Sequence, residues 1–279
     1  LPAVGAGPTV GTGPTVGAAV ASGRARLADA GCQTPRLDAE LLLAHVLDVG
    51  RERLMLDRDR ALPVSALPRW EELLARREAR EPVAYILGRR EFRRVTLTVD
   101  PRVLIPRPET ELLVEVGLEL DAGARVVDVG SGSGAVALAL KDERPDLVVR
   151  ATDVSPEAVA VARANAARLG LDVGFAQCDL LDGEPFDAVL ANLPYVVEGA
   201  VLAPEIERYE PPLALFAGAD GLDVVRRLIV MAGVVGLIAL EIASAQAAEV
   251  AGLLRAAGYR GVEVRRDLAR LDRVVVGRA

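Results

Sequence analysis

The sequence predicts an α/β protein in which a largely parallel sheet has helices on both faces and is preceded by a small helical domain. From residue 125 on, short apolar runs of strand type alternate with helical segments, a pattern typical of such a sheet. A glycine-rich turn follows the first of these runs. Upstream, between residues 18 and 80, apolar residues recur at helical spacing. With 279 residues, 51% of them hydrophobic, the chain is long enough for one medium domain and one smaller one.

The N-terminal part divides into a leader and the helical domain. Residues 1–17 contain Gly-Pro-Thr-Val-Gly twice, and this Gly/Pro-rich composition predicts a flexible leader. Residues 18–90 are expected to form the helical domain. Within it Leu37, Leu41 and Ala44 fall on one face of a predicted helix.

A β-hairpin linker is expected over residues 91–106. Apolar residues alternate from 95 to 105 on both sides of Asp100-Pro101, which places the predicted turn at this pair. Residues 107–279 then form the sheet domain.

The strands of the sheet domain are predicted from short apolar runs bounded by turns. Ser155 followed by Pro156 combines a helix cap with a proline at the first helical position, so a helix is expected over 156–169. Another helix is expected from residue 135, and the last two strands are close enough in sequence to pair antiparallel. The predicted strands are 125–129, 147–151, 173–177, 186–191, 236–241, 262–265 and 273–276.

Composition excludes several classes of protein. The 40 acidic residues outnumber the 33 basic ones, and a net charge of −7 gives no general attraction for nucleic acid, so no stable nucleic-acid binding is expected. The longest uncharged apolar run, 228–240, is shorter than the ~20 residues that cross a bilayer. The 2 cysteines do not make a disulfide framework and lack metal-ligand spacing, so no metal is expected. A cytoplasmic, monomeric protein is the expectation.

The glycine-rich turn, Asp128-Val-Gly-Ser-Gly-Ser-Gly134, follows a strand and opens a helix. Glycines at such a turn let the backbone approach a ligand. The third glycine comes one residue earlier than in the dinucleotide fingerprint, which favours S-adenosylmethionine over a nicotinamide cofactor. Asp153 ends the next strand, where a carboxylate can accept hydrogen bonds from both ribose hydroxyls. Dinucleotide enzymes also place an acid there, so Asp153 by itself does not discriminate.

A second motif, Asn192-Leu-Pro-Tyr195, follows the predicted strand 186–191. In an open parallel sheet this position lies at the carboxyl edge, beside the ligand crevice. The Asn192 Oδ1 atom and the Leu193 carbonyl could accept the two N–H bonds of a planar amino or amide group, with Tyr195 packed on its face. The motif therefore predicts a substrate that carries a flat NH2 group.

Taken together, these motifs resemble one enzyme family. Ile105-Pro-Arg-Pro-Glu-Thr-Glu111, the glycine turn and Asn192-Leu-Pro-Tyr195 are similar to the motifs of the release-factor glutamine N(5)-methyltransferases of HemK/PrmC type. The Pro-Arg-Pro-Glu-Thr-Glu run is the most specific, and the likeness covers nearly the whole chain after the leader. The family usually has proline where Leu193 stands, so the rigidity of a fixed φ is lost here.

The resemblance implies a Rossmann-like, seven-stranded class I methyltransferase domain with a substrate-recruiting helical domain. The implied enzyme transfers a methyl group from S-adenosyl-L-methionine to the side-chain amide nitrogen of the glutamine in the Gly-Gly-Gln motif of peptide-chain release factors. S-adenosyl-L-homocysteine is the implied product.

Carried over by position, the resemblance also implies which residues form the site. The four residues from Asn192 to Tyr195 would grip the glutamine and act as the catalytic group, and a preceding segment would close over it. The implied cofactor residues are Gly130, Ser131, Gly132, Ser133, Gly134, Asp153, Asp179, Leu180 and Asn192. The implied substrate residues are Asn192, Leu193, Pro194, Tyr195, Pro106, Arg107 and Glu109.

Two alternatives stay open at this point. Asn-Leu-Pro-Tyr is also typical of ribosomal-RNA adenine dimethyltransferases, and 76–94 holds seven arginines, so an adenine N6-methyltransferase acting on RNA or DNA is the second hypothesis. The acidic balance of residues 91–279 argues against it. The third hypothesis is a protein-binding module that has lost catalysis.

Overall fold

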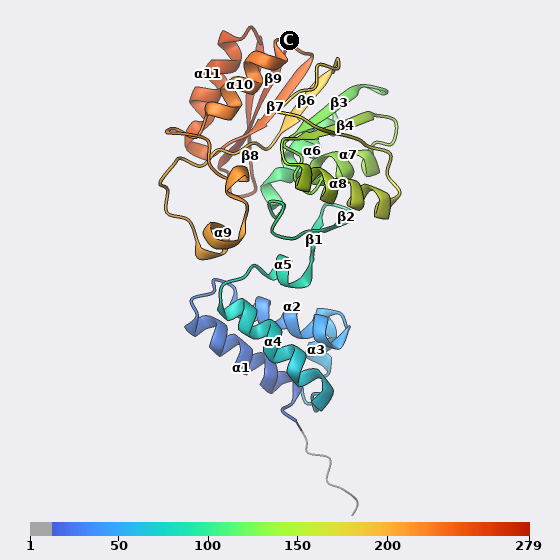
Figure 1. The fold of residues 1–279 in the computed structure, drawn as a ribbon, viewed down its shortest axis with the longest axis vertical. Coiled ribbons are helices and arrows are strands. Elements are labelled where there is room, and N and C mark those ends of the chain that lie inside the picture. The colour runs from blue at the N-terminus through green and yellow to red at the C-terminus, as the bar shows by residue number, and fades with distance from the viewer. Residues whose placement is uncertain (1–12) are drawn as a thin grey trace, which may run out of the picture. The chain divides into compact units, whose positions relative to one another are not determined.

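The computed structural model describes residues 13–279, and the chain divides into two compact units between Leu87 and Gly88 (Figure 1). This division falls three residues before the expected end of the helical domain at residue 90. Most of the expected leader, residues 1–17, lies outside the described residues. Its last two residues already belong to the first helix, which Thr15 caps by accepting a hydrogen bond from Ala18 N at 3.1 Å.

The first unit is entirely helical. Its core centres on Trp70, whose ring lies so close to Gly23 that any side chain there would collide with it. The second helix buries Leu42 and Leu43 completely and leaves Leu37 37% exposed, so its buried face is not the one that contains Leu37. The helices are α1 Val16–Asp29, α2 Pro35–Leu47, α3 Arg51–Leu56, α4 Leu67–Glu78 and α5 Val83–Leu87, with a short 3₁₀ turn at Val64–Ala66.

A β-hairpin opens the second unit, but its turn was predicted at the wrong place. Strand β1 (Arg89–Phe92) pairs antiparallel with β2 (Val95–Thr98), so the turn lies at Arg93-Arg94 and not at Asp100-Pro101. The alternation of buried residues in β2 was correctly predicted. Its partner was missed because β1 is three-quarters charged. Asp100 ends the extended segment by accepting a hydrogen bond from Arg102 N at 3.0 Å.

A seven-stranded sheet forms the centre of the second unit, as expected (Figure 1). The strands lie in the order β5-β4-β3-β6-β7-β9-β8; the first five are parallel, and β9 runs antiparallel to both β7 and β8. Their bounds are β3 Arg125–Val129, β4 Val148–Asp153, β5 Gly174–Gln177, β6 Ala188–Ala191, β7 Leu237–Glu241, β8 Gly261–Arg266 and β9 Asp272–Arg278.

Helices cover both faces of this sheet. Figure 1 shows α10 and α11 on one face and α6, α7 and α8 on the other. The predicted cap of α8 is present, because Ser155 Oγ accepts a hydrogen bond from Ala158 N at 3.1 Å. The helices are α6 Glu111–Leu118, α7 Ala135–Glu143, α8 Pro156–Leu169, α9 Pro204–Tyr209, α10 Asp223–Ala232 and α11 Ala247–Ala256, with 3₁₀ turns η2 Pro108–Thr110, η3 Pro212–Ala214 and η4 Ser244–Gln246.

The strand order decides where a ligand can bind. From β3 the chain continues outward through β4 and β5 and then returns to β6 on the other side of β3. In open sheets of this kind, ligands bind outside the carboxyl ends of the strands at such a reversal. Across residues 13–279, the helices are all too short or too polar to traverse a lipid bilayer.

Candidate active site

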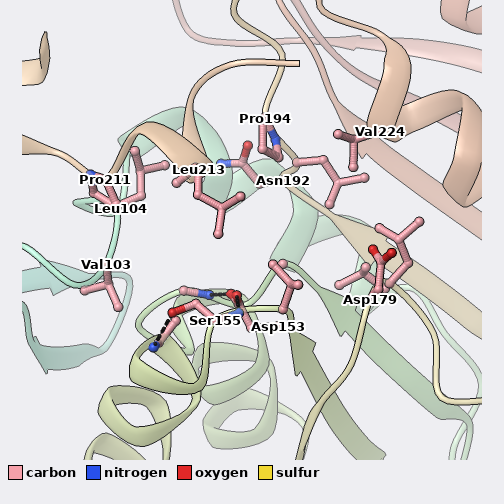
Figure 2. Close-up of a pocket in the computed structure, with 18 of the residues that line it drawn as sticks. Val103, Leu104, Asp153, Ser155, Asp179, Asn192, Pro194, Pro211, Leu213 and Val224 are labelled. Atoms are coloured by element: carbon pink, nitrogen blue, oxygen red, sulfur yellow. Dashed lines mark hydrogen bonds between the residues drawn. The ribbon is translucent and has the colours of Figure 1, made fainter. Parts of the chain in front are cut away.

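A cavity of about 340 Å³ opens at the carboxyl ends of β3, β4 and β6. In Figure 2, Asp153 and Ser155 lie on one side of it and Asn192 and Pro194 on the opposite side, with Asp179 towards one end. Several predicted site residues line the cavity: Gly130, Gly132, Asp153, Asp179, Leu180, Asn192, Leu193 and Pro194.

The glycine turn after β3 adopts a backbone that only glycine accepts easily. Gly130 and Gly132 have φ values of 73° and 54°, in the left-handed region. The amides of Gly130 and Ser131 both donate to the Thr152 carbonyl, at 2.9 and 3.0 Å, which ties the turn to β4. Ser131, Ser133 and Gly134 belong to the same turn without lining the cavity.

Asp153 is held in place by two backbone hydrogen bonds. Its Oδ2 atom accepts from Gly132 N and its Oδ1 atom from Ser155 N, both at 2.9 Å. Burial raises the pKa of Asp153, and these two hydrogen bonds act in the opposite direction. Since each carboxylate oxygen has two lone pairs, each can still accept a hydroxyl proton from a ribose.

The end of the cavity lined by Asp179 and Leu180 suits an adenine ring. Leu180 is buried and has an unusual φ of 70°, and its carbonyl accepts a hydrogen bond from Thr152 Oγ1 at 2.5 Å. Asp179 lies beside it and forms an ion pair with Arg227. A nucleoside cofactor fits these features together: the apolar wall at Leu180, the carboxylates of Asp179 and Asp153, and a glycine turn whose backbone a ligand can approach closely.

Asn192, at the end of β6, is oriented by a residue from η2. Its Nδ2 atom donates to Thr110 Oγ1 at 3.0 Å, which leaves Oδ1 as the acceptor for a ligand. The Tyr195 hydroxyl lies 3.5 Å from Glu241 Oε1. Burial raises the pKa of Tyr195 to about 12. The motif thus places Asn192 in the cavity lining, with its amide nitrogen bound to Thr110, and keeps Tyr195 outside the lining.

The closing segment expected at Pro106, Arg107 and Glu109 does not line the cavity either. Arg107 Nη2 donates to Glu210 Oε1 at 2.6 Å, and the Pro106 carbonyl accepts from Arg90 Nε at 3.2 Å. The charges of Arg107 and Glu109 instead act on Tyr195. The hydrogen bonds of this segment therefore join it to Arg90 and Glu210 and not to the cavity.

Sequence reasoning missed several cavity walls and two buried polar residues. The missed walls come from the segment after the hairpin, from the loop around η3 and from the start of α10. Figure 2 labels Val103, Leu104, Pro211, Leu213 and Val224, and Phe216 also lines the cavity. The missed polar residues are Thr110 and Glu241, 4% and 1% exposed. Glu241 did carry a signal, because an acid that ends an all-apolar strand is unusual.

The seven-stranded sheet with its glycine turn, strand-end acid and Asn-Leu-Pro-Tyr turn at one edge defines a class I methyltransferase. Residues 18–88 match the family model of the PrmC N-terminal domain, and residues 108–207 match that of the methyltransferase small domain. The chain belongs to the release factor glutamine methyltransferase family.

Two curated relatives establish this membership. A release factor glutamine methyltransferase from Deinococcus radiodurans is 43% identical over 91% of this chain and 95% of its own length. One from Rhodospirillum rubrum is 40% identical over 91% of this chain and 82% of its own length. The predicted family, enzyme class and S-adenosylmethionine cosubstrate are confirmed.

Among solved structures, the hMettl16 catalytic domain in complex with the MAT2A 3′UTR hairpin 6 has a TM-score of 0.57 at 15% identity. The match covers 74% of this chain and 82% of that one. At this identity the likeness concerns the fold alone.

Proposed function

We propose that this chain transfers a methyl group from S-adenosylmethionine to the side-chain amide nitrogen of the glutamine in the Gly-Gly-Gln motif of peptide-chain release factors. The observation that carries the proposal is the orientation of Asn192. Asn192 lines the cavity and its Nδ2 atom is engaged by Thr110, so its amide oxygen is left as an acceptor for an N–H donor. A glutamine side-chain amide is such a donor.

We assign the cofactor to the glycine turn and to the acids that follow β4 and β5. When bound, S-adenosylmethionine supplies an electrophilic methyl group on a sulfonium sulfur. Asp153 would hold its ribose, and Leu180 and Asp179 would contact its adenine. The residues proposed for the cofactor remain Gly130, Ser131, Gly132, Ser133, Gly134, Asp153, Asp179, Leu180 and Asn192.

Catalysis would rest on orientation and on polar stabilisation. An amide nitrogen is a weak nucleophile because its lone pair is delocalised into the carbonyl, so it must be held in line with the methyl carbon. A C–N bond forms as the S–C bond breaks, and the nitrogen then loses one proton to solvent. Acceptors at Asn192 Oδ1 and the Leu193 carbonyl strengthen their hydrogen bonds as positive charge develops on nitrogen, which stabilises the transition state selectively.

The roles of the other parts belong to the same proposal. The helical unit would recruit the release factor, Pro194 and Tyr195 would complete the turn that grips the glutamine, and Pro106, Arg107 and Glu109 would support it. We further propose that the protein acts as a monomer in the cytoplasm, where translation is terminated, and that it forms no stable complex with nucleic acid.

The adenine N6-methyltransferase alternative has lost part of its support. It rested on the Asn-Leu-Pro-Tyr motif and on the basic stretch 76–94, and arginines of that stretch are engaged with acids. The ion pairs are Arg76 with Glu81, Arg77 with Asp38, Arg93 with Glu143 and Arg94 with Asp142. Paired in this way, these side chains offer less charge for phosphate contacts.

The decisive experiment is incubation of the protein with S-adenosylmethionine labelled in its methyl group and a purified release factor. Label should enter the wild-type release factor and not a variant in which the loop glutamine is replaced by alanine. Labelling of both proteins, or of RNA in their place, would overturn the assignment.

A further inference from the structure

A buried carboxyl group lies beside the Tyr195 hydroxyl of the candidate active site. Glu241 ends β7, is only 1% exposed, and its Oε2 atom has no hydrogen-bond partner among residues 13–279. Burying an acid in this way costs free energy, because water no longer solvates the charged form. Such a group calls for a functional explanation.

The polar neighbours of Glu241 are residues of the active site. The hydroxyls of Thr110 and Tyr195 both act on it as hydrogen-bonding groups that favour its ionised form, and the Tyr195 oxygen is 3.5 Å from Oε1. The charge of Arg273 also favours ionisation, and that of Glu109 opposes it. Burial is the largest influence and raises the pKa of Glu241 to about 7.

Other charged groups on the adjacent elements have partners elsewhere. Arg273 on β9 is bound to Asp267 at 3.1 Å, and Glu111 on α6 accepts a hydrogen bond from Arg93 N at 3.2 Å. Opposite Glu241 in the β7–β9 register stands the apolar residue Val274. The pKa of Glu241 is therefore set first by its own burial, then by the Thr110 hydroxyl and the charges of Arg273 and Glu109, and least by the Tyr195 hydroxyl.

The hydroxyl of Thr110 links this carboxyl to Asn192. Asn192 Nδ2 donates to Thr110 Oγ1 at 3.0 Å, so the single proton of Thr110 is left for another acceptor. Glu241 is a candidate for that role, because the Thr110 hydroxyl lowers its pKa and its Oε2 atom has no other partner among the described residues. If the amide of Asn192 turned over, its Oδ1 atom would need the same proton, and the carboxylate would compete for it.

We propose that Glu241 is a positioning residue for methyl transfer: its carboxylate accepts the Thr110 proton and so keeps Asn192 Oδ1 directed at the substrate amide. The same charge directs the Tyr195 hydroxyl away from the cavity. The inference rests on the proposed function for its catalytic readout. It concerns a residue that does not line the cavity and contacts the substrate turn only through the Tyr195 hydroxyl.

Protonation of Glu241 should weaken this control over the orientation of the Asn192 amide. A neutral Glu241 can donate to Thr110, so the Thr110 proton is no longer committed and both orientations of the Asn192 amide become accessible. We therefore expect the wild-type kcat to rise with pH through an apparent pKa near 7 and to level off above it, since the ionised form is the active one.

The kinetic test uses two variants at position 241 with purified release factor as substrate. Glu241→Met keeps the size and removes every acceptor, and we expect kcat at pH 8 to fall tenfold or more. Glu241→Gln keeps an acceptor without a charge, and its kcat should be intermediate and independent of pH between 6 and 8. The KM for S-adenosylmethionine should stay within threefold in both.

Matched controls separate positioning from general damage. Thr110→Val should reproduce the loss, and Thr110→Ser, which keeps the hydroxyl, should retain activity within threefold. Glu184→Gln removes an exposed acid and should change nothing. Because Glu241→Met also removes a buried charge, it should unfold at a higher denaturant concentration than wild type at pH 8, which means that stability and activity move in opposite directions.

A second readout does not depend on the substrate. The side-chain NH2 signals of Asn192, identified by their loss in Asn192→Asp, should titrate near pH 7 in wild type and not in Glu241→Gln. Any one of three results would overturn the proposal. The wild-type kcat could fall as pH rises, the pH dependence of kcat could persist in Glu241→Gln, or the NH2 signals of Asn192 could stay unchanged with pH. If no release factor is methylated at all, the proposed function fails, and the NMR titration still decides the role of Glu241.

Discussion

Arg107 donates through Nη2 to Glu210 Oε1 at 2.6 Å, across 103 positions of sequence. The Glu210 side chain is 1% exposed, and its other oxygen lies 3.4 Å from Ile105 N. This pair joins the segment after the hairpin to the loop that precedes η3. Both segments supply cavity walls, through Leu104 and Leu213, so the ion pair joins two parts of the cavity wall.

The first prediction concerns that pair. Arg107→Ala leaves the Glu210 carboxyl buried without its cation, and we expect the free energy of unfolding at pH 8 to fall by about 2–3 kcal/mol. Burial already raises the pKa of Glu210, so lowering the pH favours the neutral acid, which tolerates the change better, and the loss should be smaller at pH 5 than at pH 8. Denaturant unfolding at both values of pH measures this. Arg102→Ala, which removes an exposed ion pair with Asp100, should cost less than about 1 kcal/mol.

A second prediction concerns catalysis at the Asn-Leu-Pro-Tyr turn. Asn192→Ala removes the acceptor aimed at the substrate, and turnover should fall by roughly two or more orders of magnitude, as when one preorganised polar group is lost from an active site. Cofactor binding, measured by calorimetry, should weaken much less. Near-normal turnover would remove Asn192 from the proposed mechanism.

The third prediction concerns the glycine turn and has a matched control. Gly130 has a φ of 73°, and a Cβ there would approach Leu193 Cδ2 to 3.1 Å. Gly183 has a similar φ of 85° with nothing within 4 Å. Alanine at either site introduces comparable backbone strain of about 1–2 kcal/mol. Only Gly130→Ala also disturbs the cavity, so it should raise the dissociation constant of S-adenosylmethionine about tenfold or more, and Gly183→Ala should leave it unchanged.

The fourth prediction concerns stability and pH. Asp128 is 2% exposed, and burial raises its pKa to about 7 from an ordinary value of 3.8. Because the folded form holds its proton more tightly than the unfolded chain does, its contribution to stability is complete below pH 4. That contribution is lost as pH rises through 7, an effect on the order of 4 kcal/mol.

Asp128→Asn removes this titration and keeps an oxygen that can accept from Ala137 N, the present partner of Oδ2 at 3.1 Å. Relative to wild type, the variant should therefore gain at least about 1 kcal/mol of stability between pH 5 and pH 8. Denaturant midpoints across that range measure the difference. A constant difference would show that Asp128 does not titrate there.

Much of the fold could be predicted because it depends on local chemistry. The helix opened by Ser155-Pro156, the turn after β3 and the alternating strands of the sheet domain all follow from cap residues, glycine conformations and apolar periodicity within a few neighbours. Several of the residues expected at the carboxyl edge line one cavity, because parallel strands bring their ends together.

Pairing choices were harder to predict. Strand β2 alternates clearly, but its partner β1 is mostly charged, so the turn was placed after β2 and not before it. In α2, a run of three leucines allows several buried faces, and packing against the neighbouring helices selects the one with Leu42 and Leu43. Both decisions depend on contacts that periodicity does not encode.

The sequence by itself determined the fold class, the family and the cofactor, because the motifs that indicate them are runs of contiguous residues. Only the tertiary structure decided which distant residues meet. Thr110 accepts a hydrogen bond from Asn192, the Tyr195 hydroxyl lies beside Glu241, and Arg107 pairs with Glu210. These partners lie tens of residues apart or more along the chain. Their hydrogen bonds exist because the sheet order brings the ends of β6 and β7 together with η2, a proximity that no local pattern contains.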